Sequence, residues 1–208
     1  ARVSFVAAGD LSDETSVTRF YEGLNDLWAS IHLAGGFAVA PIARSDKALL
    51  MGQLETNLVS AYLCSRSAAT APARKGSGGR IVDVASRPGP EKRLGSRAGN
   101  EPLTGVSIAA SRQALESRLG SGAVAYTIAK AGVAALTAAL GAELATEDIL
   151  VNAVAPSIMD TPDNRKAMPA ADFASWPKVA DVAGAILWLA SPANKVTRGA
   201  VVPVYGAT

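Results

Sequence analysis

The chain has 208 residues, of which 49% are apolar, and this length and composition suit a single domain with a substantial core. The formal net charge is only +2 and the basic residues are scattered, apart from a loose patch between Arg74 and Arg97, so we expect no nucleic-acid partner. No apolar run approaches the roughly 20 residues that span a bilayer, and the first residues do not resemble a signal peptide, so we expect no membrane partner.

The chain contains a single cysteine, Cys64, and a single histidine, His32. One cysteine excludes an internal disulfide framework and fits the cytoplasm, which is the compartment we expect. One histidine argues against a metal site and against most Ser-His hydrolases, and no Gly-x-Ser-x-Gly elbow is present. We therefore interpret His32 as structural and Cys64 as a core residue on an apolar helix face.

Apolar periodicity and turn residues predict strands and helices in alternation. In chain order we expect a strand at 2–8, a helix within 12–27, a short strand within 28–36, a long helix at 47–71, a strand at 78–86, a long helix at 125–145, a strand at 149–157, a helix at 179–191 and a last strand within 199–206. This alternation predicts an α/β fold: a Rossmann-like, doubly wound parallel sheet with helices on both faces, in one domain over 1–208. Ligands bind such sheets beyond the carboxyl ends of the strands, where we place Asp10, Gly35, Ser86 and Pro156.

The stretch AYTIAKAG, at 125–132, places Tyr126 and Lys130 four residues apart at the start of a predicted helix. Residues at this spacing lie on one helix face, with side chains in reach of each other. A tyrosine has an ordinary pKa of about 10, and a fixed lysine cation beside it favours the phenolate and lowers that value. We therefore interpret the pair as a candidate general acid or base with its activating cation.

Further motifs extend this interpretation along nearly the whole chain, because they resemble those of the short-chain dehydrogenase/reductase family in order and spacing. GDL at 9–11 resembles the family's Asp-hydrophobic pair, and HLAGG at 32–36 its Asn-Asn-Ala-Gly turn, with His32 and Leu33 in place of the asparagines. TNLVS at 56–60, GRIVDVAS at 79–86, YTIAK at 126–130 and VNAVAPSIMDTP at 151–162 resemble the segments that carry the catalytic asparagine, the catalytic serine, the Tyr-x-x-x-Lys pair and the nicotinamide site. Ser157 stands where glycine is usual.

The resemblance implies an oxidoreductase that transfers a hydride between NAD or NADP and a small-molecule carbonyl or secondary alcohol. Tyr126 would transfer the proton, Lys130 would tune the phenol and bind the ribose, and Asn57 would relay protons to solvent. A serine would hold the substrate oxygen as an oxyanion donor does. The implied cofactor-binding residues are Asp10, Leu11, Ala34, Gly35, Gly36, Tyr126, Lys130, Pro156, Ser157, Ile158 and Thr161.

Two serines compete for the catalytic role, because ASRPGPEKRLGS at 85–96 and ASRQALESRLGS at 110–121 match at eight of twelve positions. The family's serine precedes its tyrosine by a little over a dozen residues. Ser111 lies 15 residues before Tyr126 and has the better spacing, whereas Ser86 lies 40 residues before it but ends a convincing strand. We favour Ser86 and interpret 87–124 as an irregular inserted or duplicated segment.

A second departure from the family is that no glycine-rich turn precedes Asp10. Such a turn cradles the dinucleotide pyrophosphate at a helix N-terminus. We expect either an N-terminally truncated sequence, which we favour, or a non-catalytic relative that serves as a binding or regulatory subunit and binds no dinucleotide. The resemblance also implies a homodimer or homotetramer and a flap at 161–176 over the substrate, and the end of the chain is weakly similar to the dihydropteridine-reductase-like members of the family.

Overall fold

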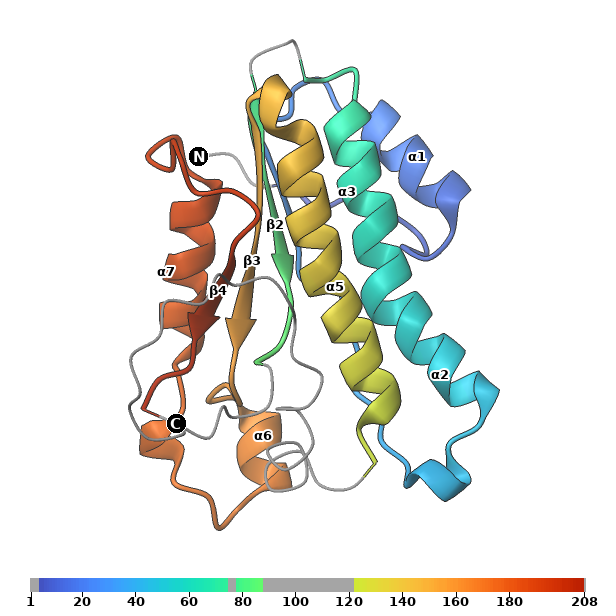
Figure 1. Cartoon of the computed structure of the whole chain (residues 1–208), viewed down its shortest axis with the longest axis vertical. Helices are drawn as coiled ribbons and strands as arrows, with labels where there is room; N and C mark the ends of the chain where they lie inside the picture. Colours follow the sequence, from blue (N-terminus) through green and yellow to red (C-terminus); the bar gives the residue numbers. More distant parts are fainter. Residues whose placement is uncertain (1–3, 75–77, 88–121, 208) are drawn as a thin grey trace, which may run out of the picture.

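The computed structural model describes residues 4–74, 78–87 and 122–207 (Figure 1). Its centre is a sheet of four parallel strands in the order β1-β2-β3-β4. The strands are β1 (Ala29–His32), β2 (Gly79–Val84), β3 (Ile149–Pro156) and β4 (Val201–Val204). The predicted α/β class and parallel sheet are therefore confirmed.

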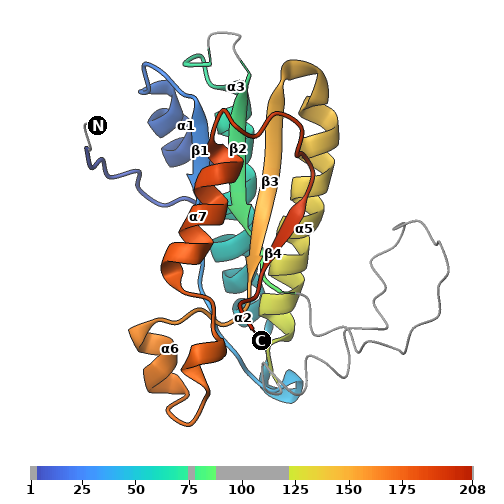
Figure 2. The same ribbon diagram turned by 90° about the vertical axis from the view of Figure 1, so that its left-hand side faces the viewer.

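Helices cover both faces of the sheet (Figure 2). One face carries α7 (Val179–Ala190), and the other carries α5 (Val124–Glu143) beside α2 (Lys47–Leu54) and α3 (Ser60–Thr70). A π-helical turn, η2 (Glu55–Val59), joins α2 to α3, and α1 (Glu14–Glu22) packs against α3. The short elements are η1 (Ile42–Arg44), η4 (Leu144–Glu147), α6 (Pro162–Ala167) and η5 (Phe173–Ser175).

Side-chain caps fix where several helices begin. The Asp13 carboxylate accepts a hydrogen bond from the Ser16 N–H at the start of α1, and Asp46 does the same from Leu49 at the start of α2. These bonds satisfy backbone N–H groups that have no partner inside the helix. The cap at Asp13 starts α1 within the predicted range, and the helix ends at Glu22 rather than continuing to residue 27.

Strand residues alternate between two buried layers, as the period of a strand requires. Ile81 of β2 and Ala85, directly after the strand, face the layer of α3 and α5, whereas Val82 and Val84 of β2 face α7. Every residue of β3 is buried, because this strand lies inside the sheet with helices on both faces. Helices therefore pack against both faces of the sheet and hold the central strands in place.

The predicted strand at 2–8 is wrong for its described residues. Residues 4–8 form no strand, and the side chains of Phe5 and Val6 are 96% and 71% exposed. An apolar run becomes a strand only when a neighbouring strand pairs with its backbone, and residues 4–8 are not among the paired strands of the sheet. Asp10, which follows it, therefore does not end a strand as we expected.

Helix α5, continued by η4, is the one described helix whose length and hydropathy would allow it to cross a membrane. This is weak support for a membrane span, because the core helix of a globular domain passes the same test. Here α5 lies along β3 and carries Lys130 against β2, which is the arrangement of a core helix.

Candidate functional site

The ends of β1, β2 and β3 lead into segments that hold predicted site residues. Gly35 comes shortly after the end of β1, and Ser86 follows β2. Backbone hydrogen bonds to β3 flank Ser86 on both sides, from Ala85 N–H to Val154 O (2.9 Å) and from Arg87 N–H to Pro156 O (3.1 Å). The sheet ladder therefore continues past the end of β2 and fixes the backbone on which the Ser86 hydroxyl stands.

Asn57 lies in the π-helical turn η2 and is 1% exposed. Its amide nitrogen donates to Gly36 O (2.9 Å) and Gln53 O (3.0 Å), and its oxygen accepts from Gly36 N–H (3.2 Å). A π turn inserts one extra residue into a helix and is frequent at functional sites. In this chain the turn ties the middle of the long helix to the glycines that follow β1.

The side chains of Ser86 and Tyr126 meet between β2 and the first turn of α5. Burial raises the pKa of the Tyr126 phenol, and a hydrogen bond from the Ser86 side chain opposes that increase. The Tyr126 ring also packs edge-on against Phe37, with ring centroids 4.9 Å apart. Ser86, the serine we favoured, is thus close enough to the predicted catalytic tyrosine to influence its pKa, whereas Ser111 lies outside the described residues.

Lys130 is buried one turn along α5, with 8% exposure, and its ammonium donates to Val84 O (2.7 Å). A Cβ atom built on Gly35 would lie 2.9 Å from Asn57 Oδ1 and 3.5 Å from Lys130 Nζ. The structure therefore gathers Gly35, Asn57 and Lys130 in one place, although 95 residues separate the first from the last.

The electrostatics of the tyrosine differ from our expectation. We expected Lys130 to lower the pKa of Tyr126, but burial is the main influence on this phenol and raises its pKa. Burial likewise lowers the pKa of Lys130, and the charge of Asp83 opposes this decrease. The sequence prediction considered the charge of the lysine but not the removal of both groups from water, which favours their neutral forms.

The other predicted cofactor residues fall into two groups. Leu11 and Ala34 line the same cavity of about 410 Å³ between α1, β1 and α3, whereas Asp10 is exposed and accepts two hydrogen bonds from Ser12 at 2.8 Å. After β3, the Ser157 hydroxyl donates to Tyr205 O (2.8 Å), and Thr161 caps α6 by accepting from Asn164 N–H (3.2 Å). Pro156 ends β3, and the half-buried Ile158 follows it.

Two features of the site have no signal in the sequence. Phe37 contacts the Tyr126 ring from a segment without regular structure, and no motif marks it. Asp160 accepts from Arg165 Nε (2.5 Å) and from Lys178 Nζ (2.6 Å), an ion-pair cluster that anchors the segment containing α6 to the start of α7. Sequence patterning finds neither, because both depend on loop conformations.

Solved structures of several oxidoreductases have this fold. A short-chain dehydrogenase/reductase from Mycobacterium ulcerans superposes with a TM-score of 0.73 at 21% identity, covering 95% of this chain and 67% of its own. Acetoin dehydrogenase from Enterobacter cloacae gives 0.67 at 29% identity, covering 95% and 72%, and ElxO with NADP bound gives 0.71 at 22%, covering 95% and 75%. No curated protein matches the sequence significantly.

A family model described as enoyl-(acyl carrier protein) reductase matches residues 103–206, which is half of the chain. The matched region contains the tyrosine and lysine of α5, strand β3 and the segment that follows it. Together with the parallel sheet and the structural matches, this shows that the chain belongs to the short-chain dehydrogenase/reductase family.

Proposed function

We propose that the protein is an NAD(P)-dependent oxidoreductase that acts on a small carbonyl compound or the corresponding secondary alcohol, with Tyr126 as its proton donor and acceptor. The observation that carries this proposal is the grouping of three residues at the carboxyl edge of the sheet: Ser86 just after β2, Tyr126, whose pKa Ser86 influences, and Lys130, buried one helical turn further along α5 and bonded to Val84 O. Family membership and the NADP-bound state of ElxO support the choice of a nicotinamide cofactor.

The two hydroxyl groups suit the polarised oxygen of a carbonyl. In the reductive direction the neutral Tyr126 phenol gives its proton to the substrate oxygen, and the Ser86 hydroxyl donates a hydrogen bond to that oxygen as negative charge develops on it. Burial raises the pKa of Tyr126, so the phenol holds its proton at neutral pH and is ready to act as an acid. In the oxidative direction the phenol would first lose its proton to solvent, and the phenolate oxygen would then receive the proton of the alcohol.

The residues around Gly35 fit a dinucleotide that approaches the backbone closely. Any side chain at Gly35 would collide with Asn57 and crowd Lys130, so only glycine leaves room beside the Lys130 ammonium. The chemistry that such a cofactor would supply is the transfer of a hydride to or from the substrate carbon. Lys130 would hold the ribose hydroxyls, Leu11 and Ala34 would contact the adenine end, and Ser157 and Thr161 would lie beside the nicotinamide.

Turnover can be followed by the ultraviolet absorbance of reduced nicotinamide, with NADH and NADPH each tested against a vicinal diketone and an enoyl thioester. These two compounds represent the activities named for the Enterobacter cloacae enzyme and for the matching family model. Tyr126→Phe should lower kcat by at least about 10²–10⁴-fold, the usual contribution of general acid–base transfer. Ser86→Ala should lower it by about 10²–10³-fold, by analogy with the loss of an oxyanion donor.

Tyr62→Phe is the matched control, because Tyr62 lies half-exposed on α3 and carries the same change. We expect it to leave turnover unchanged. If Tyr126→Phe keeps the wild-type rate, the catalytic role of the tyrosine is wrong. The same assay is made on a chain in which a strand, a glycine-rich turn and a helix are restored upstream of residue 1, because the glycine-rich turn binds the pyrophosphate. If that chain also turns over neither compound with either cofactor, the non-catalytic alternative is favoured.

A further inference from the structure

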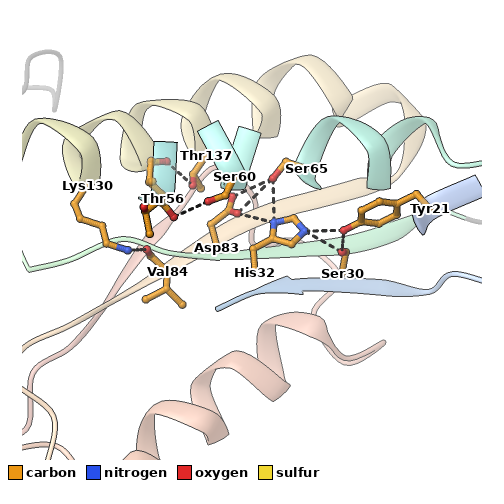
Figure 3. Close-up of polar contacts among 11 residues, drawn as sticks. Tyr21, Ser30, His32, Thr56, Ser60, Ser65, Asp83, Val84, Lys130 and Thr137 are labelled. Atoms are coloured by element: carbon orange, nitrogen blue, oxygen red, sulfur yellow. Dashed lines mark hydrogen bonds and ion pairs between the residues drawn. The ribbon is translucent and has the colours of Figure 1, made fainter. Parts of the chain in front are cut away.

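A group of buried polar side chains lies between the sheet and the layer of α3 and α5 (Figure 3). At its centre the Asp83 carboxylate of β2, with 0% exposure, lies 2.8 Å from His32 Nδ1 of β1. The Ser65 hydroxyl of α3 lies 3.3 Å and 3.5 Å from the two carboxylate oxygens. Two strands and a helix therefore hold this carboxylate in one position.

The other ring nitrogen of His32 is also satisfied inside the protein. His32 Nε2 lies 2.9 Å from Ser30 Oγ and 3.2 Å from Tyr21 OH, and those two oxygens are 2.7 Å apart. Because one nitrogen contacts a carboxylate and the other contacts two hydroxyls, the ring orientation is determined from both sides. His32 is thus structural, as the sequence suggested, but it acts specifically on Asp83.

Besides its hydrogen-bond partners His32 and Ser65, Asp83 interacts electrostatically with one buried lysine, Lys130. The titratable groups that face it are Tyr21 of α1, His32 of β1, Cys64 of α3 and Lys130 of α5. Within the described ranges, Lys130 forms no ion pair within 4.0 Å, and its ammonium donates to the carbonyl of Val84, the residue after Asp83. A buried ammonium is stable only when an opposite charge or hydrogen bonds replace water.

The position of Asp83 also connects it to the proposed active site. His32 and Asp83 are paired in the β1–β2 register, and each precedes a site residue by three positions, Gly35 on one strand and Ser86 on the other. The contact between these two side chains therefore links β1 and β2 three residues before Gly35 and Ser86.

We propose that Asp83, held by His32, is the buried counter-charge of Lys130 and a positioning residue for the active site. The role of Asp83 as a counter-charge does not depend on the proposed function, whereas its role in positioning the active site does. Burial lowers the pKa of Lys130, and the negative charge of Asp83 raises it. This agrees with the proposal, because Asp83 would then help to keep the Lys130 ammonium protonated for the reaction.

The hydrogen bond can be tested directly, because His32 is the single histidine of the chain. Nitrogen-15 spectra of the protein labelled in histidine contain the signals of one imidazole ring. The protonation of each ring nitrogen can therefore be assigned to His32. We expect Nδ1 to carry a proton at neutral pH, whether or not Nε2 also does. A neutral ring with its proton on Nε2 alone would overturn the arrangement, since Nδ1 could not then donate to Asp83.

The counter-charge is tested with Asp83→Asn, which keeps the shape of the side chain and removes its charge. The ammonium of Lys130, assigned in labelled spectra with Lys130→Arg, should lose its proton at lower pH than in the wild type. Thr137→Val is the matched control, because Thr137 is fully buried on α5 and, among the residues that the structure describes, its hydroxyl donates to Val133 O of its own helix and not to Asp83. If the Lys130 titration does not move in Asp83→Asn, the counter-charge is wrong.

If Asp83→Asn does not fold, the double variant His32→Asn/Asp83→Asn places two neutral amides opposite each other and should shift Lys130 in the same direction. In the turnover assay either variant should lower kcat by about tenfold or more, because small displacements of reacting groups are costly. A shifted Lys130 with unchanged kcat would overturn the positioning role. Absence of turnover both in the wild type and in the chain with the restored upstream segment would count against the proposed function instead, while the Lys130 titration would still decide the counter-charge.

Discussion

Replacing Gly35 by alanine should disturb the proposed site through a single added methyl group. The new Cβ atom would lie 2.9 Å from Asn57 Oδ1, closer than a carbon and an oxygen without a bond can approach, and 3.5 Å from Lys130 Nζ. Asn57 has little room to move, because it is 1% exposed and its amide makes three hydrogen bonds to Gly36 and Gln53.

The size of the effect follows from those bonds. An intramolecular hydrogen bond contributes about 0.5–1.5 kcal/mol, so loss of the three Asn57 amide bonds on rotation away from the methyl group would cost about 1.5–4.5 kcal/mol. The alanine also restricts the unfolded chain, which offsets about 0.4–1 kcal/mol. We therefore expect Gly35→Ala to lower the free energy of unfolding by about 1–4 kcal/mol.

Urea denaturation followed by circular dichroism measures this change. With a slope of about 2 kcal/mol per molar urea, which lies within the range of small proteins, the midpoint should fall by about 0.5–2 M at an unchanged slope. Gly52→Ala is the control: nothing lies within 4 Å of its Cβ position in α2, so alanine should stabilise by about 0.5–1 kcal/mol. A Gly35→Ala protein as stable as Gly52→Ala would refute the close approach of Gly35 to Asn57.

Three further predictions concern stability, the flap and assembly. Burial raises the pKa of the Cys64 thiol from 9.0 to about 11, so the stability contributed by the neutral thiol is present below about pH 9 and is lost as the pH rises toward 11. The midpoint of urea denaturation should therefore fall between about pH 9 and 11, and it should fall less in Cys64→Ala. Hydrogen bonds from Arg165 and Lys178 hold the pKa of Asp160 well below its usual range, so Asp160→Asn should release the segment around α6 and speed its proteolysis several-fold, which mass spectrometry of the fragments measures. The outer face of α5 exposes Ile128, at 48%, so we expect a dimer or tetramer by light scattering and a shift toward monomer in Ile128→Lys.

Each of these has an outcome that contradicts it. A urea midpoint that stays constant between pH 9 and 11 would show that Cys64 reaches solvent. Equal proteolysis rates in the wild type and Asp160→Asn would mean that the ion-pair cluster does not anchor the segment. A wild-type monomer at high concentration would remove the assembly prediction.

The order of strands and helices could be predicted from the sequence, because it depends on local apolar periodicity. Strand β2 and helix α5 have patterns that agree with their burial, so the place of Ser86 just after β2 and those of Tyr126 and Lys130 on α5 followed from the sequence. The resemblance to a known family added Asn57, and the structure places it beside Gly36 through hydrogen bonds that no local pattern encodes.

Three features could not be predicted from the sequence, because they depend on contacts between segments that are distant in the chain. Residues 4–8 have the composition of a strand but lie exposed, because a strand needs a partner backbone and the pattern cannot show whether one is present. The pKa of Tyr126 is raised because the fold removes the phenol from water, an effect that the spacing to Lys130 does not contain. His32 and Asp83 are 51 positions apart in the sequence, and only the register of β1 against β2 brings the imidazole to the carboxylate, since side-chain contact across a sheet is fixed by strand pairing.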